Sequence, residues 1–173
     1  MAKKHKQNNY KLLLLYISFL AVFGPYGEIL IGTLYTAAFG THLWNYHVFP
    51  VHTAYTSLAA PFIWGLAGAI TYFLHARFYA RSTLTLWVLS AFVAVEMLIT
   101  ELIINFLYHI AKGGYIFYYY PGDLLHFASL QTLPFYYLVG IAVFVGMKRF
   151  QRDPIFFSIL SIAFMIVLVY IAR

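Results

Sequence analysis

Five apolar segments, each bounded by polar or basic residues, constrain this chain more than any other feature. Hydrophobic residues make up 63% of its 173 residues and charged residues 9%, whereas soluble domains carry about 25% charged residues. Such a chain cannot cover itself with polar surface in water, so we expect it to fold in a bilayer. The expected spans are residues 10–39, 59–75, 83–108, 133–147 and 155–172. The predicted fold class is therefore all-α: a five-helix, multi-pass membrane protein with a single membrane domain over residues 1–173.

The first apolar segment is longer than the ~20 residues that a helix needs to cross a membrane. We therefore expect it to tilt, to kink at Gly24-Pro25, or to leave the hydrocarbon before its end. Its basic start resembles that of a secretory signal, but no small-residue cleavage site follows closely. We interpret it as a retained first span.

The basic residues predict the orientation. With the N-terminus cytoplasmic, nine of the 11 basic residues lie inside, and Lys112 and Arg173 lie outside. This bias favours that orientation and an odd number of spans. The nine are Lys3, Lys4, Lys6, Lys11, Arg77, Arg81, Lys148, Arg149 and Arg152. The net charge is +6, and the basic residues that produce it are clustered at segment ends, where they suit contact with lipid headgroups. We therefore expect the bilayer as partner and no nucleic acid.

Part of the chain recurs later in the sequence at a constant offset. We call this the repeat offset and define it as the number of residues from Glu28 to Glu101. The other identical positions are Ile31/Ile104, Leu34/Leu107, Tyr35/Tyr108, Ala38/Ala111, Gly40/Gly113, Tyr46/Tyr119, Pro61/Pro134 and Phe62/Phe135. Trp44/Phe117 and Trp64/Tyr137 keep an aromatic ring. We predict two parallel two-helix repeats, at about 10–80 and 83–152, plus an extra helix at 155–172. Their symmetry axis would run along the membrane normal.

Glu28 and Glu101 are the leading candidates for catalytic residues. A carboxylate within a span is costly and points to a functional site. Tyr35 and Tyr108 lie two turns further along the same helix faces. Asn105 lies one turn from Glu101 and is expected to hydrogen-bond it. The alternative is a structural pair of carboxyl groups bonded across the repeat axis.

Glu96 is a third candidate acid. It lies five residues before Glu101, so it is about 140° around the helix and cannot share one narrow face with it. Two interpretations remain open. Glu96 lines the same cavity from a deeper position, or it bonds a Ser, Thr or Tyr on a neighbouring helix.

Aromatic residues make up 21% of the chain. Belts at the membrane interfaces account for part of this content. The functional alternative is an aromatic cavity around the acids, since aromatic faces stabilise cations. The candidate substrate-binding residues are Tyr35, Tyr108, Trp44, Tyr46, Trp64, Asn105 and Tyr119.

The sequence contains no cysteine, which excludes disulfides, thiolate catalysis and Cys-ligated metals. A divalent metal is still possible because imidazole suits several metals, although the sequence requires no cofactor. The weak candidate ligands are His42, His47, His52, His109, Asp123 and His126. The five-residue steps from His42 to His52 match neither one helical nor one strand face.

The repeat unit, an acid in a span followed by Gly and an aromatic loop, resembles small multi-pass membrane proteins of Gram-positive bacteria. A fainter similarity is to integral-membrane carotenoid-modifying enzymes. In those enzymes Glu-x-x-Gly-Thr precedes Phe-Gly, here Glu28, Gly32, Thr33, Phe39 and Gly40. The second copy departs from that pattern at Asn105, Phe106 and Lys112. The first resemblance implies a cell-membrane location, in the bacterial inner membrane.

Three functions are consistent with these features. The first is a membrane enzyme of cyclase or isomerase type, acting by acid/base chemistry on a lipophilic substrate such as an isoprenoid. The second is a small proton-coupled carrier or permease, which with two spans per repeat predicts a homodimer. The third is a non-catalytic subunit or assembly factor of a larger membrane complex, docked through the fifth span.

Overall fold

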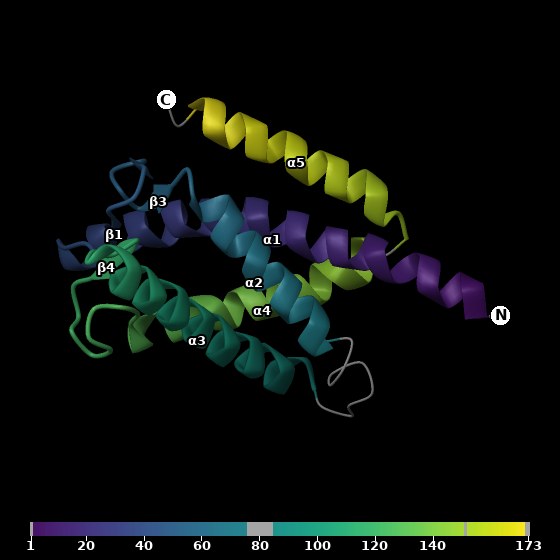
Figure 1. The fold of residues 1–173 in the computed structure, drawn as a ribbon, viewed down its shortest axis with the longest axis horizontal. Helices are drawn as coiled ribbons and strands as arrows, with labels where there is room; N and C mark the ends of the chain where they lie inside the picture. Colours follow the sequence, from purple (N-terminus) through teal and green to yellow (C-terminus); the bar gives the residue numbers. More distant parts are fainter. Residues whose placement is uncertain (1, 76–84, 151, 172–173) are drawn as a thin grey trace.

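The computed structural model describes residues 2–75, 85–150 and 152–171, and side chains within 10–75, 85–150 and 152–166. Five α-helices dominate it (Figure 1). They are α1 (Ala2–Phe39), α2 (Ala60–Leu74), α3 (Leu86–Lys112), α4 (Leu133–Phe150) and α5 (Pro154–Ile171). The strands are β1 (Trp44–Tyr46), β2 (Pro50–Val51), β3 (Thr56–Ser57) and β4 (Phe117–Tyr119). The basic residues Arg77, Arg81 and Arg173, on which the expected orientation partly depends, lie outside the described residues.

The helices run back and forth along the long axis of the molecule (Figure 1). The most extensive packing is of α1 against α2, of α3 against α4 and of α5 against α1. The short strands gather at one end, away from the N-terminus (Figure 1). The loops and strands therefore lie at one end of the molecule. The acids of α1 and α3 lie in the interior between these two helices.

Among the described residues, three helices are long and apolar enough to cross a membrane: Tyr10–Phe39, Leu86–Lys112 and Leu130–Phe150, the last of which includes a 3₁₀ turn before α4. Two others, Ala60–Leu74 and Pro154–Ile166, are apolar but shorter. Large apolar side chains such as Phe92, Ile99, Phe106 and Ile110 are exposed along α3. A surface of this kind is suited to contact with lipid.

The first helix is longer than expected and continues through Pro25. A left-handed glycine follows α1 and another follows α3: Gly40 and Gly113, each with a φ of 71°. Glycine adopts this conformation without steric cost and commonly ends helices. The two glycines are related by the repeat offset, so both helices end at equivalent positions of the chain.

The expectation of a purely helical chain needs a correction, because the loops that follow α1 and α3 pair as strands. β1 pairs antiparallel with β4, Trp44 facing Tyr119 and Tyr46 facing Phe117. The flanking backbone bonds correspond as well. His47 N–H donates to the Ile116 carbonyl at 2.8 Å, and Tyr120 N–H donates to the Leu43 carbonyl at 3.1 Å.

The repeat offset relates these contacts in pairs. Trp44 and Tyr119 are carried onto Phe117 and Tyr46, and His47 and Ile116 are carried onto Tyr120 and Leu43. Such a pattern marks a local two-fold relation between the strands. The strand centres, Asn45 and Tyr118, face each other. We call the paired strands β1 and β4 the strand ribbon. Helical periodicity in a sequence cannot reveal strands of only three residues, so this pairing could not be predicted from it.

Two glycines let helix backbones pack closely within each pair. A Cβ on Gly68 of α2 would lie 2.5 Å from the Tyr16 carbonyl oxygen of α1. A Cβ on Gly140 of α4 would lie 2.9 Å from the Ser90 backbone of α3. Small residues at such crossings are what helix association in membranes requires.

Gly68→Ala is expected to lower the melting temperature of the detergent-purified protein, because the added methyl group must push α1 and α2 apart. Overpacking of this kind costs about 1–3 kcal/mol. Gly65→Ala is the matched control, since its Cβ would meet Ile17 at an ordinary 3.5 Å. Equal melting temperatures for the two variants would contradict this account of the crossing.

Candidate functional site

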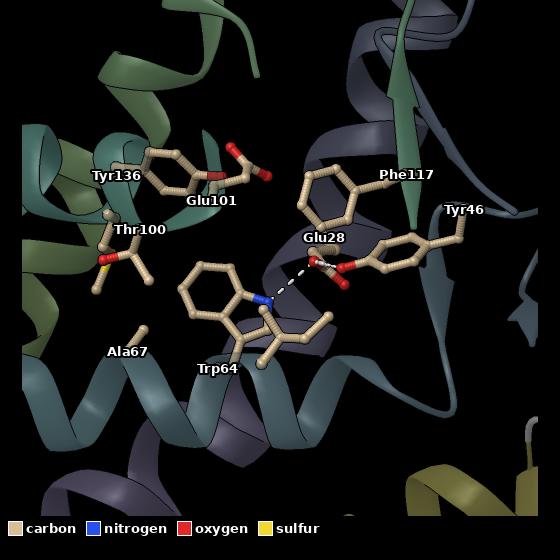
Figure 2. Close-up of a pocket in the computed structure, with 10 residues that line it drawn as sticks. Glu28, Tyr46, Trp64, Ala67, Thr100, Glu101, Phe117 and Tyr136 are labelled. Atoms are coloured by element: carbon tan, nitrogen blue, oxygen red, sulfur yellow. Dashed lines mark hydrogen bonds between the residues drawn. The ribbon is translucent and has the colours of Figure 1, made fainter. Parts of the chain in front are cut away.

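Glu28 of α1 and Glu101 of α3 line the same cavity (Figure 2). The cavity has a volume of about 30 Å³, which is room for about two water molecules. The remaining lining residues come from β1, α2, α3, β4 and α4; they are Tyr46, Ile63, Trp64, Ala67, Met97, Thr100, Phe117 and Tyr136. Two acids that are related by the repeat offset therefore meet in one small space.

Glu28 is held by three donors and is only 7% exposed. Tyr46 Oη–H donates to Glu28 Oε1 at 2.5 Å, and Trp64 Nε1–H donates to the same oxygen at 2.9 Å. Thr56 Oγ1–H donates to Oε2 at 2.5 Å. Both carboxylate oxygens thus act as acceptors, an arrangement that stabilises an ionised group.

Glu101 has fewer donors. Tyr119 Oη–H donates to Glu101 Oε1 at 2.5 Å, and the Tyr136 hydroxyl points toward the carboxyl group (Figure 2). Its Oε2 is shielded from solvent and has no hydrogen-bond partner among the described residues. A buried carboxyl oxygen without a donor is the place where a proton is most easily held.

The strand ribbon supplies the tyrosine to each acid. Tyr46 and Tyr119 are inward-facing residues of β1 and β4, because alternate side chains of a strand point to one face. Burial, and then the nearby Glu28 charge, raises the pKa of Tyr46 well above its ordinary value. Burial, and then Glu101, does the same to the pKa of Tyr119. Both phenols therefore stay neutral and remain able to donate.

The contacts that α2 makes with Glu28 and α4 makes with Glu101 do not follow the repeat offset, but a spacing one residue shorter. Tyr46 and Tyr119 are related by the repeat offset, but the residue of α4 that faces Glu101 is Tyr136 (Figure 2). The repeat offset would carry Trp64 one position further, onto Tyr137, which keeps an aromatic ring in the sequence but does not line the cavity. Ser57 and Ser129 keep the shorter spacing, as their side chains accept from the Ala59 and Gln131 N–H groups.

The expected bond between Asn105 and Glu101 is also wrong. The fully buried Asn105 amide donates instead to the carbonyls of Phe117, at 2.7 Å, and Phe127, at 3.0 Å. Its own carbonyl accepts from the Ile116 N–H at 2.9 Å. Asn105 thus fixes β4 to α3 and only indirectly positions the Tyr119 hydroxyl.

Other candidate residues lie outside the cavity lining. Tyr35 donates to Gln131 Oε1 at 2.9 Å, and Trp44 donates to the Tyr55 carbonyl at 2.8 Å. Tyr108 does not line the cavity either. Glu96 accepts from Thr71 Oγ1 at 2.9 Å, which matches the expectation of a partner on a neighbouring helix and not that of a shared cavity.

The candidate metal ligands do not converge. No group of three His, Asp or Glu side chains that could hold a metal ion occurs in the part of the chain that the structure describes. Instead, His42 bonds Asn45, His109 bonds the Gly114 carbonyl, and Asp123 accepts from the Leu130 N–H. His126 lies 2.6 Å from the Tyr119 carbonyl, and the rings of His47 and Tyr118 stack. The His52 Nε2 is buried without a partner among the described residues.

Seven contributors to the site were not singled out from the sequence as binding residues: Thr56, Ile63, Ala67, Met97, Thr100, Phe117 and Tyr136. Phe117 was visible only as the counterpart of Trp44 in the recurring segment. Thr100 lies one residue before Glu101, so it gave no separate signal. Thr56 reaches Glu28 because β3 folds back on β2, which no local pattern indicates.

No protein-family model, curated protein or solved structure matches this chain significantly.

Asn105→Ala is expected to destabilise the protein by more than about 2 kcal/mol, because it leaves three backbone groups unpaired, the buried carbonyls of Phe117 and Phe127 and the partly buried N–H of Ile116. The melting temperature of the purified protein measures this. Asn45→Ala is the control. The half-buried Asn45 side chain donates to Tyr120 Oη and also bonds His42, and water can replace both bonds, so the cost should be below about 1 kcal/mol. Equal destabilisation would show that Asn105 does not fix β4.

Proposed function

We propose that this protein is an integral-membrane enzyme that performs acid/base chemistry on a lipophilic substrate, with an isoprenoid as the favoured class. The observation that supports it best is the convergence of Glu28 and Glu101 on one cavity with aromatic walls. Two carboxyl groups in different environments can act as acid and base in one reaction. The five-span arrangement in a bacterial inner membrane belongs to the same proposal.

The hydrogen bonds favour a distinct role for each acid. Glu101, whose Oε2 meets no donor among the described residues, is the acid, and Glu28, with three donors, is the carboxylate. The Glu101 proton adds to a substrate double bond, whose π electrons form the new C–H bond and leave a carbocation. The faces of Trp64 and Phe117 stabilise that cation. Glu28 then removes a proton from a neighbouring carbon, which restores a double bond, and the proton returns to Glu101 through cavity water.

An apolar groove supports access from the bilayer. It lies between α1 and α4 and has a volume of about 260 Å³. Phe135 belongs to this groove and packs edge-on against the Trp64 ring of the acid cavity, with ring centroids 6.1 Å apart. The cavity itself is water-sized, so a carbon skeleton must displace this ring pair to reach the acids.

A second candidate function is a proton-coupled carrier. The observation that favours it is the size of the cavity, since about 30 Å³ suits water and protons better than hydrocarbon. The enzyme proposal predicts that a lipid is chemically changed even when no pH gradient is present. The carrier predicts proton movement across vesicle membranes that depends on a transported solute.

Glu101→Gln is expected to lower turnover by about 10²–10⁴-fold, the usual contribution of a general acid. The substrate is unidentified, so the probe is a bacterial isoprenoid and phospholipid extract incubated with the purified protein in D₂O. Each proton added to carbon then appears by mass spectrometry as one deuterium. Glu28→Gln should reduce deuterium incorporation to a similar degree.

Asp123→Asn is the control, because Asp123 lies outside the cavity lining and the amide keeps an oxygen that can accept from the Leu130 N–H. It should incorporate deuterium at the wild-type rate. The proposal fails if no lipid gains deuterium with the wild-type protein. It also fails if both Gln variants match the wild type while remaining folded.

A further inference from the structure

One buried acid plays no part in the chemistry above. Glu96 is 9% exposed, and its Oε1 accepts from Thr71 Oγ1 at 2.9 Å. Its Oε2 is buried and has no hydrogen-bond partner among the described residues. A bond that only tied α2 to α3 would need one acceptor, which a neutral amide supplies as well. An acid with such a shielded oxygen retains the capacity to bind and release a proton.

Glu96 and Thr71 lie one helical turn away from the acid cavity. Thr71 follows Ala67 by four residues on α2, and Glu96 precedes Thr100 by four residues on α3. Residues four apart are neighbours on a helix face, about 6 Å apart. Both Ala67 and Thr100 line the cavity that contains Glu28 and Glu101. The Thr71–Glu96 pair is therefore the next polar layer along the same two helices.

A third layer lies one more turn along α2. His75 follows Thr71 by four residues, and its Nδ1 lies 2.7 Å from the Tyr16 hydroxyl of α1. His75 is half-buried, at the end of α2 away from the strands (Figure 1). The layers thus form a polar column along α2: the acid cavity, then Thr71–Glu96, then His75–Tyr16.

We infer that Glu96 passes protons between the acid cavity and the His75–Tyr16 end of the bundle. The titratable groups along the column are Tyr16 from α1, Tyr72 and His75 from α2, and Tyr136 from α4, with Glu28, Glu101, Tyr46 of β1 and Tyr119 of β4 at the cavity. In each transfer Glu96 releases its proton to cavity water, which protonates the Glu101 carboxylate. Glu96 is reprotonated from the His75 end, so one proton moves and no other reactant is consumed.

The relay depends on the proposed function only in that Glu101 is the proton donor of the reaction. The relay defines the side of the membrane from which Glu101 is reprotonated. That side is the one where α2 ends, opposite to the strand ribbon. The relay can therefore be tested through the protonation of Glu101 itself, without a substrate.

The test uses a hydrophobic carbodiimide, which reacts with protonated buried carboxyl groups. The full-length protein is reconstituted into phosphatidylcholine–phosphatidylglycerol vesicles, and a protease-cleavable N-terminal tag reports its orientation. The pH is stepped on one side at a time, and labelling of Glu101 is quantified by peptide mass spectrometry. In the wild type, raising the pH on the His75 side should reduce Glu101 labelling by up to about tenfold per pH unit, once the carboxyl is mostly ionised.

Glu96→Gln keeps an oxygen that accepts from Thr71 but cannot carry a proton. In this variant the same pH step should change early Glu101 labelling by less than about twofold. Glu96→Asp should restore part of the response. Ser90→Ala, which removes a buried hydroxyl of α3 outside the column, should behave like the wild type.

A full response in Glu96→Gln would overturn the relay, and so would a wild type in which Glu101 ignores the pH on the His75 side. If Glu96→Gln does not fold, Thr71→Val tests the same layer and should weaken the response. Failure of the enzyme proposal is recognised separately. In that case the deuterium assay is negative while Glu101 labelling still follows the pH on the His75 side.

Discussion

The antiparallel pairing of β1 with β4 joins two segments that are far apart in the sequence and fixes both tyrosines that bind the acids. Each strand is only three residues long and could not persist alone. It is stable here because its inward residues pack against each other and against the helices, as with Tyr46 on Phe117. The Asn105 side chain then satisfies backbone groups that the short ladder leaves unpaired. Loss of this ribbon would remove the main donor of Glu101 and one of the three donors of Glu28.

The cost of burying carboxyl groups explains why hydroxyl and indole donors surround the two acids. An unpaired charge inside an apolar bundle is unfavourable by several kcal/mol, so each acid is held by hydroxyl or indole donors. The distribution of donors is unequal: Glu28 receives three, whereas one oxygen of Glu101 receives none from the described residues. Recurrence of the sequence thus provides two similar acids, and small differences around them place the acids in different chemical environments.

Much of the architecture could be predicted from the sequence. The apolar segments predicted the five helices, which the structure confirms to within a few residues at most ends, although α1 begins earlier than expected. The recurrence of Glu28, Tyr46 and Gly40 at Glu101, Tyr119 and Gly113 placed the important residues in equivalent positions. Asn105 was assigned the wrong partner because helical spacing says which side chains are neighbours on one helix, but not which strand packs against them.

Composition and periodicity determined that this chain forms apolar helices with rare acids inside them, because those properties depend on local sequence and on the solvent. Only the tertiary structure decided that Glu28 and Glu101 share one cavity, that Glu96 does not, and that Tyr136 rather than Tyr137 faces Glu101. Those outcomes depend on how helices are rotated against each other: α2 and α4 begin at positions related by the repeat offset, Ala60 and Leu133, but the side chains that face the acids, Trp64 and Tyr136, are one position closer in the sequence. A rotation of about 100° per residue makes a one-residue change in register decisive for which side chain reaches the site.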